Sequence, residues 1–360
     1  RCRESAFRYV KEWESMTERA GVWLDMDNAY VTYHNSYIET AWWVFKRLWD
    51  ADHVYEGYKV TPHCPRCVTS LSSHEVALGY QDDTPDPSVF VRFLVDEHPT
   101  SDHGASADVL ARLGYANGAW TSARPAFMAW TTTPWTLTAN MALAVSPIQR
   151  YALMQSDPLE SGEAGERIVI AESLAERVLG NAWTAVATFT GAELVGVGYQ
   201  PPYVGEALAS HAHRVLAADY VTTDEGTGIV HTAPAYGADD ADLGKANNFP
   251  TVHTVDLRGV LQGGFPGAGK FVKNADKDLI ADLDQRGLLF RSGTIEHTYP
   301  FCWRCGTPLL YYAKASWYIQ TTAVKDQMVS GNRSINWHPD HIKEGRFGEW
   351  LRNNVDWAVS

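Results

Sequence analysis

Four of the five cysteines in this chain fall in two short, nearly identical motifs that lie far apart. Residues 62–67 read PHCPRC and residues 300–305 read PFCWRC, so both follow the pattern P-x-C-x-R-C. Two C-x-x-C pairs supply four thiolates, the ligand set of a tetrahedral structural zinc site with no open catalytic position. A single pair would suit a redox centre equally well, but two near-copies favour zinc. The predicted ligands are Cys64, Cys67, Cys302 and Cys305.

The distance between the two motifs constrains the whole fold. If one ion joins both pairs, residues 68–301 form an insertion that leaves and re-enters the chain at one place. Each motif also ends a strand-like segment, GYKVT before the first and IEHTY before the second. We therefore predict a zinc-ribbon stalk that carries an inserted domain. The expected divisions are 1–55 and 320–360 for parts of a parent domain, 56–86 and 293–319 for the two halves of the stalk, and 87–292 for the insertion.

The insertion has the texture of a small β-rich domain. Short apolar runs are separated by turns that contain Gly or Pro, which predicts a mostly antiparallel β-barrel or sandwich with a few helices. These runs are SVFVRFLV, AFMAWTTT, MALAV, YALM, RIVIA, RVLAADYV and GIVHTA. The stretch 101–120 is polar and rich in small residues, so we predict that it is a surface insertion.

Two helices are predicted from capping residues and apolar spacing. Ser36 and Glu39 form a capping-box pattern at the start of the first helix. Its apolar stripe would comprise Ile38, Trp42, Phe45 and Trp49. The second helix is predicted to begin after Asn274 as N-cap and to end at Gly287. Its inward-facing residues would be Leu279, Ile280 and Leu283.

Composition limits the classes of function. Hydrophobic residues make up 45% of the chain and charged residues 20%, as in a soluble globular protein. No apolar run of 18 residues and no signal-peptide pattern is present. The formal net charge of −13 means that the surface as a whole is not a clamp for nucleic acid, so any contact with RNA would be local. The chain starts at Arg1 and ends on the strand-like VDWAVS, so we expect a piece of a longer protein.

The hydroxyls in WTTTPWTLT, residues 130–138, do not fit simple packing. Successive side chains of a strand point to opposite faces, so a packing strand would alternate threonine with apolar residues. Here Thr131, Thr132 and Thr133 place hydroxyls on both faces. We predict a hydroxyl-lined strand edge that serves a purpose other than packing.

A second polar cluster lies in DEGTGIVHTAPAYGADD, residues 224–240. Thr227 lies between two glycines that open a turn into a short strand, and this strand ends at His231. The loop after the strand carries Tyr236, Asp239 and Asp240. Taken singly, these residues have structural explanations. His231 would be a histidine at a strand end whose ring nitrogens are hydrogen-bonded, and the two aspartates would cap a helix over 239–247. Taken with the threonines, they fit a small pocket for a polar, amine-bearing ligand. The chain has no G-x-S-x-G, Walker A, G-x-G-x-x-G or H-E-x-x-H motif.

The motifs WTTTPWT and GTGIVHTAP followed by DD resemble the editing domain of isoleucyl-tRNA synthetases, the connective insertion of this class I family. Valyl and leucyl enzymes typically carry T-T-R-P-E-T or T-T-R-P-D-T, whereas this chain has Thr133 in place of the arginine and Trp135 in place of the acid. The resemblance spans essentially the whole chain, including GYKVTPHCPRC, YPFCWRCGTPLLYY, SWYI and GRFGEWLRNNVDWAVS. The family's ATP-binding signatures, resembling H-I-G-H and K-M-S-K-S, are absent.

The resemblance implies a β-barrel-like editing domain inserted through a zinc-ribbon stalk into parts of a Rossmann-type catalytic domain. It also implies a cytoplasmic, monomeric enzyme that joins isoleucine to tRNA(Ile), with ATP and Mg²⁺ used only by the full-length protein. One methylene group discriminates by only about 1–3 kcal/mol, a limit that these synthetases themselves illustrate. Such weak discrimination requires a second site that hydrolyses the wrong product. The part of the enzyme that this chain comprises would therefore hydrolyse valyl-tRNA(Ile) and exclude isoleucine by size.

The resemblance also assigns roles to residues. Asp240 would grip the α-ammonium group of the substrate through a charge-assisted hydrogen bond. His231 would lie beside the amino-acid side chain and help to set the size of the pocket. The three threonines would surround the terminal adenosine and the ester, and Trp135 would close one wall. The other expected substrate-binding residues are Asn140, Thr227, Tyr236 and Asp239.

Two other functions stay open. The first is a non-catalytic zinc-ribbon module that docks RNA, against which the acidic balance of the chain counts. The second is a metal-dependent hydrolase that uses His231, Asp239 and Asp240 as ligands. An assay for deacylation separates the first of these from an editing enzyme, and sensitivity of hydrolysis to chelators identifies the second.

Overall fold

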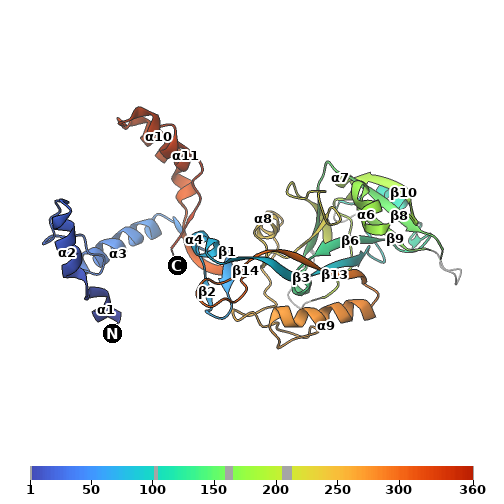
Figure 1. The fold of residues 1–360 in the computed structure, drawn as a ribbon. Helices are drawn as coiled ribbons and strands as arrows, with labels where there is room; N and C mark the ends of the chain where they lie inside the picture. Colours follow the sequence, from blue (N-terminus) through green and yellow to red (C-terminus); the bar gives the residue numbers. More distant parts are fainter. Residues whose placement is uncertain (1, 101–103, 159–164, 205–212, 360) are drawn as a thin grey trace. The chain divides into compact units, whose positions relative to one another are not determined.

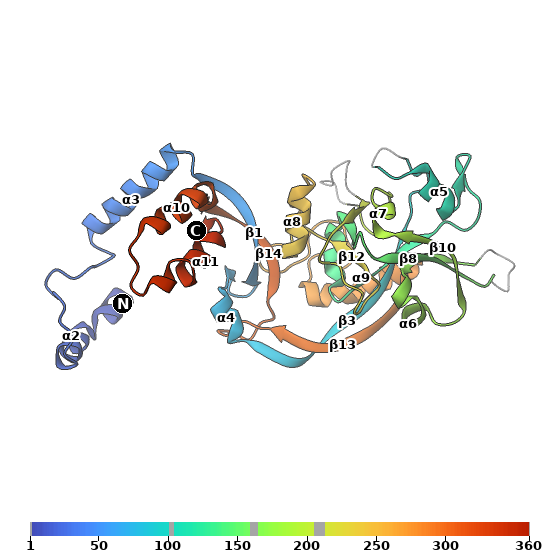
Figure 2. The ribbon, with the colours of Figure 1, turned by 90° about the horizontal axis from the view of Figure 1, so that it is seen from above.

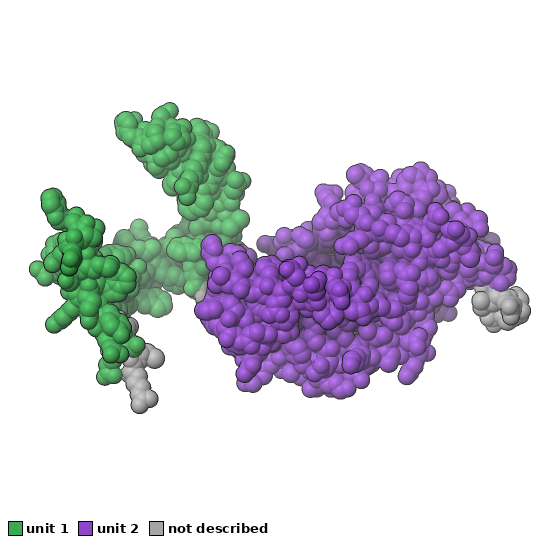
Figure 3. Space-filling view, viewed as in Figure 1, with its two compact units in different colours: residues 1–57, 316–360 green, residues 58–315 purple. Residues whose placement is uncertain are grey.

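The computed structural model describes residues 2–100, 104–158, 165–204 and 213–359. They form two compact units, distinguished by colour in Figure 3. The first unit joins residues 1–57 to 316–360, and the second comprises 58–315. The chain passes from one unit to the other within β1 (Val54–Cys64) and again within β14 (Leu310–Ile319). The five-part division expected from the sequence stays a prediction.

The first unit is mainly helical. Its elements are α1 (Cys2–Phe7), α2 (Val10–Arg19), α3 (Asn35–Asp50), η3 (Thr321–Val324), α10 (Lys325–Ser334), η4 (Asp340–Ile342), α11 (Arg346–Arg352) and β15 (Trp357–Ala358). Helix α3 is the helix predicted near residue 36, but the expected capping box is wrong. Ser36 lies inside the first turn, and the N-cap is His34, which makes no side-chain capping bond. None of the residues of α3 is buried, although Trp49 of its apolar stripe contacts Trp317, with ring centroids 5.6 Å apart.

The second unit is built on a six-stranded sheet with the order β10-β8-β9-β6-β3-β13. Its strands are β3 (Tyr80–Leu94), β6 (Ala126–Thr131), β8 (Arg150–Ser156), β9 (Arg167–Ala171), β10 (Trp183–Thr190) and β13 (Leu289–Pro300). All neighbours are antiparallel except β6 and β9, which are parallel. Strands β3 and β13 form a long curved ribbon, which Figure 2 shows along its length.

Smaller sheets complete the strand arrangement. A three-stranded sheet has the order β11-β7-β12, with β7 (Ala142–Val145) between β11 (Arg214–Ala217) and β12 (Ile229–Thr232). A four-stranded sheet has the order β15-β14-β1-β2, where β2 is Thr69–Ser70, and β4 (Tyr115–Ala116) pairs with β5 (Ala119–Trp120). The expected β-barrel is wrong for the described residues. The six-stranded sheet stays open because β10 and β13 pair on one side only.

The core of the second unit lies between the six-stranded sheet and the three-stranded sheet. Strands β7 and β9 are buried along their whole length, as fully enclosed strands require, and β6 is buried over its first four residues. Short helices pack against this core. They are α5 (Ala107–Leu113), η2 (Glu172–Leu174), α6 (Ala175–Leu179) and α7 (Gly191–Leu194). Two further short helices pack on smaller apolar clusters: α4 (Ser73–Ala77) on the cluster that contains Cys64 and Cys302, and α8 (Ala238–Ala246) through Leu243 on the outer side of the three-stranded sheet.

Helix α5 overturns the prediction that residues 101–120 are a surface insertion. Residues 101–103 lie outside the described residues, but α5 buries Val109, Leu110 and Leu113 in the main core. Ser106 caps its N-terminus by accepting the N–H of Val109, and a left-handed glycine ends it. The segment is therefore part of the packed domain.

Helix α9 (Val272–Gln285) is the helix predicted near residue 274, and Figure 1 shows it running along the β3–β13 ribbon. Its expected N-cap, Asn274, is wrong because the helix begins three residues earlier, after Phe271 in extended conformation. Leu279 and Leu283 are buried as expected, whereas Ile280 is only partly buried against the core. Gly287, with φ of +66°, follows the last turn.

Candidate functional site

The two cysteine motifs meet in space. All four thiol sulfurs lie within 4.8 Å of one another, and Cys305 Sγ is 3.5 Å from Cys64 Sγ and 3.6 Å from Cys67 Sγ. Tetrahedral zinc with Zn–S bonds of about 2.3 Å places its thiolate sulfurs about 3.8 Å apart. The backbone N–H of Cys67 points at Cys64 Sγ at 3.3 Å, as in a turn that presents two thiolates to one ion. The cluster, completed by Cys302, therefore fits a single metal ion.

The threonine run forms the end of a strand and the turn after it. Strand β6 stops at Thr131, and Thr133 is the N-cap of the 3₁₀ helix η1 (Pro134–Ala139). The expected strand edge is thus wrong beyond Thr131, because Pro134 fits the first helical position and cannot donate to a sheet. Thr131 Oγ1 accepts the N–H of Thr133 at 3.1 Å. Thr132 is half-buried, and its hydroxyl makes no hydrogen bond to a described residue.

The hydroxyls of this turn are arranged in a chain that leads to His231. Thr131 Oγ1 and Thr133 Oγ1 are 3.3 Å apart, and Thr133 Oγ1 and Thr136 Oγ1 are also 3.3 Å apart. Thr136 Oγ1 then lies 2.9 Å from Nε2 of His231, which is on strand β12. The structure therefore connects two of the three predicted threonines to the predicted histidine through Thr136.

Asn140 fixes the tautomer of His231. Its Oδ1 accepts the hydroxyl of Tyr199 at 2.6 Å, so its Nδ2 is the donor to His231 Nδ1 at 2.9 Å. Nδ1 is then the acceptor nitrogen, and Nε2 carries the proton that it donates to Thr136 Oγ1. The Thr136 hydroxyl donates its own proton to the carbonyl of Thr133 at 2.8 Å.

His231 is therefore a neutral imidazole whose two nitrogens already have partners. Burial lowers its pKa to about 4, since the protonated form loses its hydration. A neutral ring with no free lone pair does not act as a general base. It is a buried polar group with a fixed orientation next to the threonine turn.

Asp240 is hydrogen-bonded to the backbone just after β12, the strand that carries His231. Its Oδ2 accepts the N–H of Ala233, two residues after His231, at 2.9 Å. Gly237 permits this approach, because a Cβ at that position would lie 2.6 Å from the carboxylate. Burial raises the pKa of Asp240 to about 6, opposed by the Ala233 N–H and supported by the charge of Asp239. Within the described residues, no hydrogen bond joins Asp240 to the threonine run.

The other predicted substrate-binding residues differ in burial and in their hydrogen bonds. Trp135 and Tyr236 are buried and pack edge to face, with ring centroids 4.7 Å apart. The Tyr236 hydroxyl accepts the backbone N–H groups of residues 254 and 255. Thr227 is buried, and its hydroxyl bonds to the backbone of Ile229 within its own turn. Asp239 is exposed in the first turn of α8, so a binding role for it has no support from the geometry.

Sequence reasoning missed three residues that complete this network. Thr136 lies inside the WTTTPWT motif, and its position three residues after Thr133 would place both hydroxyls together once η1 is recognised. Tyr199 and Asp276 are far away in the sequence and carry no motif. Asp276, on α9, accepts the backbone N–H of Trp135 at 3.0 Å.

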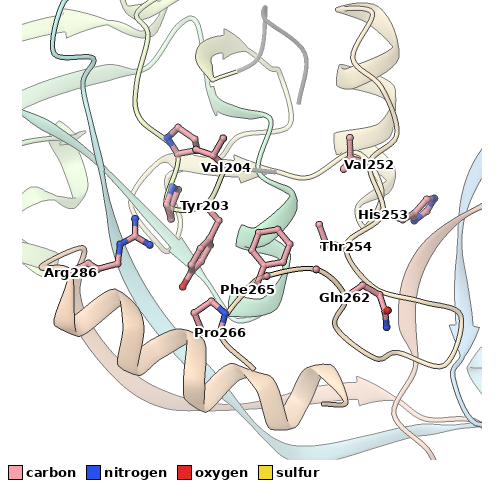
Figure 4. A pocket seen from close by; sticks show the side chains of 13 residues that line it. Tyr203, Val204, Val252, His253, Thr254, Gln262, Phe265, Pro266 and Arg286 are labelled. Carbon is pink, nitrogen blue, oxygen red and sulfur yellow. The ribbon is translucent and has the colours of Figure 1, made fainter. Parts of the chain in front are cut away.

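A separate cavity of about 690 Å³ lies in the second unit, and Figure 4 shows the side chains that line it. Tyr203 and Phe265 pack edge to face there, and the Arg286 guanidinium lies over the Tyr203 ring. No predicted site residue lines this cavity. Its wall includes Thr254, whose hydroxyl is 2.7 Å from that of Thr138 at the end of η1.

The family profile described as tRNA synthetases class I (I, L, M and V) matches residues 1–360. The chain therefore belongs to the class I tRNA synthetase family.

Within this family, the chain is similar to isoleucine--tRNA ligases. It is 48% identical over 381 residues to the one from Dehalococcoides mccartyi, covering 100% of this chain and 36% of that protein. The corresponding values are 45% identity and 32% of the protein for Thermus thermophilus, and 44% and 31% for Thermobifida fusca, again over 100% of this chain. The chain thus spans about a third of the length of these curated relatives.

Solved structures of editing domains show a weaker likeness. The crystal structure of GlLeuRS-CP1 matches with a TM-score of 0.44 and 15% identity, over 57% of this chain and 98% of that one. The cytosolic leucyl-tRNA synthetase editing domain of P. knowlesi matches with a TM-score of 0.42 and 12% identity, over 61% and 98%. Among the described residues, no helix combines the length and apolarity that crossing a membrane requires.

Proposed function

We propose that this chain hydrolyses valyl-tRNA(Ile), so that the wrong amino acid is removed after it has been attached. The observation that carries the proposal is the hydroxyl chain from Thr131 to His231, with Asp240 tied to the end of the same strand. The similarity to isoleucine--tRNA ligases supports the choice of amino acid and tRNA. The full-length protein would join isoleucine to tRNA(Ile) with ATP and Mg²⁺, and its cytoplasmic location and monomeric state stay predictions.

Hydrolysis of an aminoacyl ester needs no protein nucleophile. A water oxygen adds to the carbonyl carbon, the bond to the ribose oxygen breaks, and that oxygen leaves with a proton. The chain's own contribution is to hold the ester and the water in the reactive orientation, which accounts for a large part of many enzymatic rate enhancements. The threonine hydroxyls can both donate to the ester oxygens and accept from water.

Asp240 binds the charged amino group of the substrate. Its carboxylate would pair with the α-ammonium group, which every aminoacyl ester carries. Because the pKa of Asp240 is about 6, the carboxylate form dominates at pH 7 and is lost as the pH falls below 6. The neutral ring of His231 would face the amino-acid side chain, where a rigid wall admits valine and excludes the larger isoleucine.

We also propose that the four cysteines hold one Zn²⁺ ion. Two thiolates from each motif would connect the two ends of the inserted domain. Four thiolates complete the tetrahedral coordination of zinc, so the ion would have a structural role and would not activate water.

A metal-dependent hydrolase is less well supported. In the described part of the chain, the four cysteines are the only group of Cys, His, Asp or Glu side chains that lie close enough together to bind one ion. Both nitrogens of His231 are hydrogen-bonded, and Asp239 is exposed. An RNA-docking module would bind tRNA without hydrolysing it, so the deacylation assay decides between the two functions.

The test is deacylation of valyl-tRNA(Ile) by this chain and by Asp240→Ala. Loss of the ion pair between Asp240 and the α-ammonium group of the substrate should reduce the rate at least 100-fold, in line with about 3 kcal/mol for a charge-assisted hydrogen bond. Asp239→Ala is the matched control, since Asp239 is exposed in the same helical turn, and it should keep the rate within about twofold. Unchanged hydrolysis by Asp240→Ala would refute the assignment of this carboxylate.

A further inference from the structure

Asp276 is a buried carboxyl group that the proposed hydrolysis does not use. Its side chain is 2% exposed. Oδ1 accepts the N–H of Trp135 at 3.0 Å, whereas Oδ2 has no hydrogen-bond partner among the described residues. Burial raises its pKa to about 7, although the charge of Lys273 and the Trp135 N–H act in the opposite direction. A buried carboxyl oxygen without a hydrogen-bond partner destabilises the fold, so packing does not explain Asp276.

The hydrogen bond to Trp135 has a specific place in the 3₁₀ helix η1. Pro134, the first residue of this helix, has no N–H group, and the N–H of Thr136 donates to the carbonyl of Thr133 at 3.0 Å. The N–H of Trp135 is therefore the donor at the N-terminus of η1 that needs a partner from outside the helix. Asp276 supplies this partner from α9.

A threonine at the N-cap position usually does this work itself. Its hydroxyl accepts an N–H from the first turn of the helix. Thr133 occupies that position in η1 but makes no side-chain capping bond. Instead, the Thr133 hydroxyl lies 3.3 Å from the hydroxyls of Thr131 and Thr136, within the series of hydroxyl groups that leads to His231.

We propose that Asp276 is a positioning residue that caps η1 in place of Thr133 and so keeps the Thr133 hydroxyl available to the ester or its attacking water. This inference rests on the proposed hydrolytic function of the threonine turn. Without the carboxyl oxygen, the Thr133 hydroxyl is the capping group nearest in sequence to the Trp135 N–H. If it rotates to that N–H, the hydroxyl chain is broken between Thr131 and Thr136.

The main test compares three variants of the chain in deacylation of valyl-tRNA(Ile). Asp276→Ala removes the acceptor and should lower kcat by about 10- to 100-fold, the scale expected for a misplaced reacting group. Asp276→Asn removes the charge but keeps an amide oxygen that accepts the same N–H, so it should stay within about threefold of the unaltered chain. Asp278→Ala is the control, because Asp278 lies on the same helix in a surface ion pair with Lys270.

A second measurement does not depend on activity. Hydrogen exchange at the Trp135 amide should be slow in the unaltered chain and in Asp276→Asn, and about tenfold faster in Asp276→Ala. Thr133→Val should leave this exchange slow, because Thr133 does not cap the helix. Fast exchange in Thr133→Val would overturn the inference even if Asp276→Ala does not fold.

The two proposals fail in different ways. If the unaltered chain does not hydrolyse valyl-tRNA(Ile), the proposed function is wrong, and an unaccelerated Trp135 exchange in Asp276→Ala would then overturn the capping role as well. If the unaltered chain is active and Asp276→Ala is equally active, the function stands and the positioning role of Asp276 is wrong. Equal losses in Asp276→Ala and Asp276→Asn would also contradict it, since only one of them lacks the acceptor.

Discussion

His231 shows how a network of neutral groups can define the character of a site. Asn140 donates to one ring nitrogen and Thr136 accepts from the other, so the ring has one orientation and one tautomer. Protonation would place a second proton on Nδ1, where it would face the donor group of Asn140. Both burial and this hydrogen-bond pattern therefore keep the imidazole neutral.

The first prediction concerns acid stability. The pKa of His231 is about 4 in the folded chain and near 6.5 when unfolded, so folding loses stability as the pH falls from 6.5 to 4. His231→Gln removes this titration. The unfolding free energy of the unaltered chain should exceed that of the variant above pH 6.5, and the difference should shrink by up to about 3 kcal/mol by pH 4. Parallel pH profiles in denaturant titrations would show that the ring is not held neutral.

Sequence alone identified most of the residues in this network but not the bonds between them. Thr131, Thr133, Asn140 and His231 stand in recognisable motifs. Thr136 was visible in the same motif but was not assigned, because its role depends on a turn of 3₁₀ helix that brings it back to Thr133. Tyr199 is a single tyrosine in a strand-rich region, and nothing local in the sequence indicates that it bonds to Asn140.

At the scale of elements, α5 is the clearest difference from expectation. Composition favoured a surface loop, since the stretch is rich in Ala, Gly, Ser and Asp. The order of the residues carries a different signal: Ser106 as N-cap, apolar residues at 109, 110 and 113, and Gly114 in the left-handed region with φ of +98°. Periodicity was thus a better guide than composition here.

The second prediction follows from the burial of α5. Leu113 is fully enclosed, so Leu113→Ala should leave a cavity and lower the unfolding free energy by about 2–5 kcal/mol. Leu78→Ala makes the same chemical change at a side chain that is 72% exposed, and it should change stability by less than about 0.5 kcal/mol. Equal effects of the two substitutions in urea unfolding would mean that α5 is not part of the core.

At the scale of the whole molecule, the paired cysteine motifs were the most informative part of the sequence. They predicted that residues far apart in the chain meet, and the four thiols do lie together. The open edges of the six-stranded sheet were not predictable in the same way. Alternation of apolar residues indicates strands, but whether the last strand pairs with the first depends on the lengths and bends of all of them.

The third prediction concerns the metal. One zinc ion per chain should be found by elemental analysis, and Cys64→Ser or Cys302→Ser should each release it, because one ion needs thiolates from both motifs. Cys2→Ser, outside both motifs, is the control and should retain the full zinc content. Two ions per chain, none, or retention of zinc after loss of one motif would contradict a shared site.

The most direct test of the central claim is the selectivity of deacylation. Valyl-tRNA(Ile) and isoleucyl-tRNA(Ile) should be incubated with this chain, and the release of each amino acid measured against the uncatalysed rate. The proposed editing function predicts that valine is released at least about tenfold faster than isoleucine, within the range that one methylene allows. Equal release of both amino acids, or no release above the uncatalysed rate, would contradict the account.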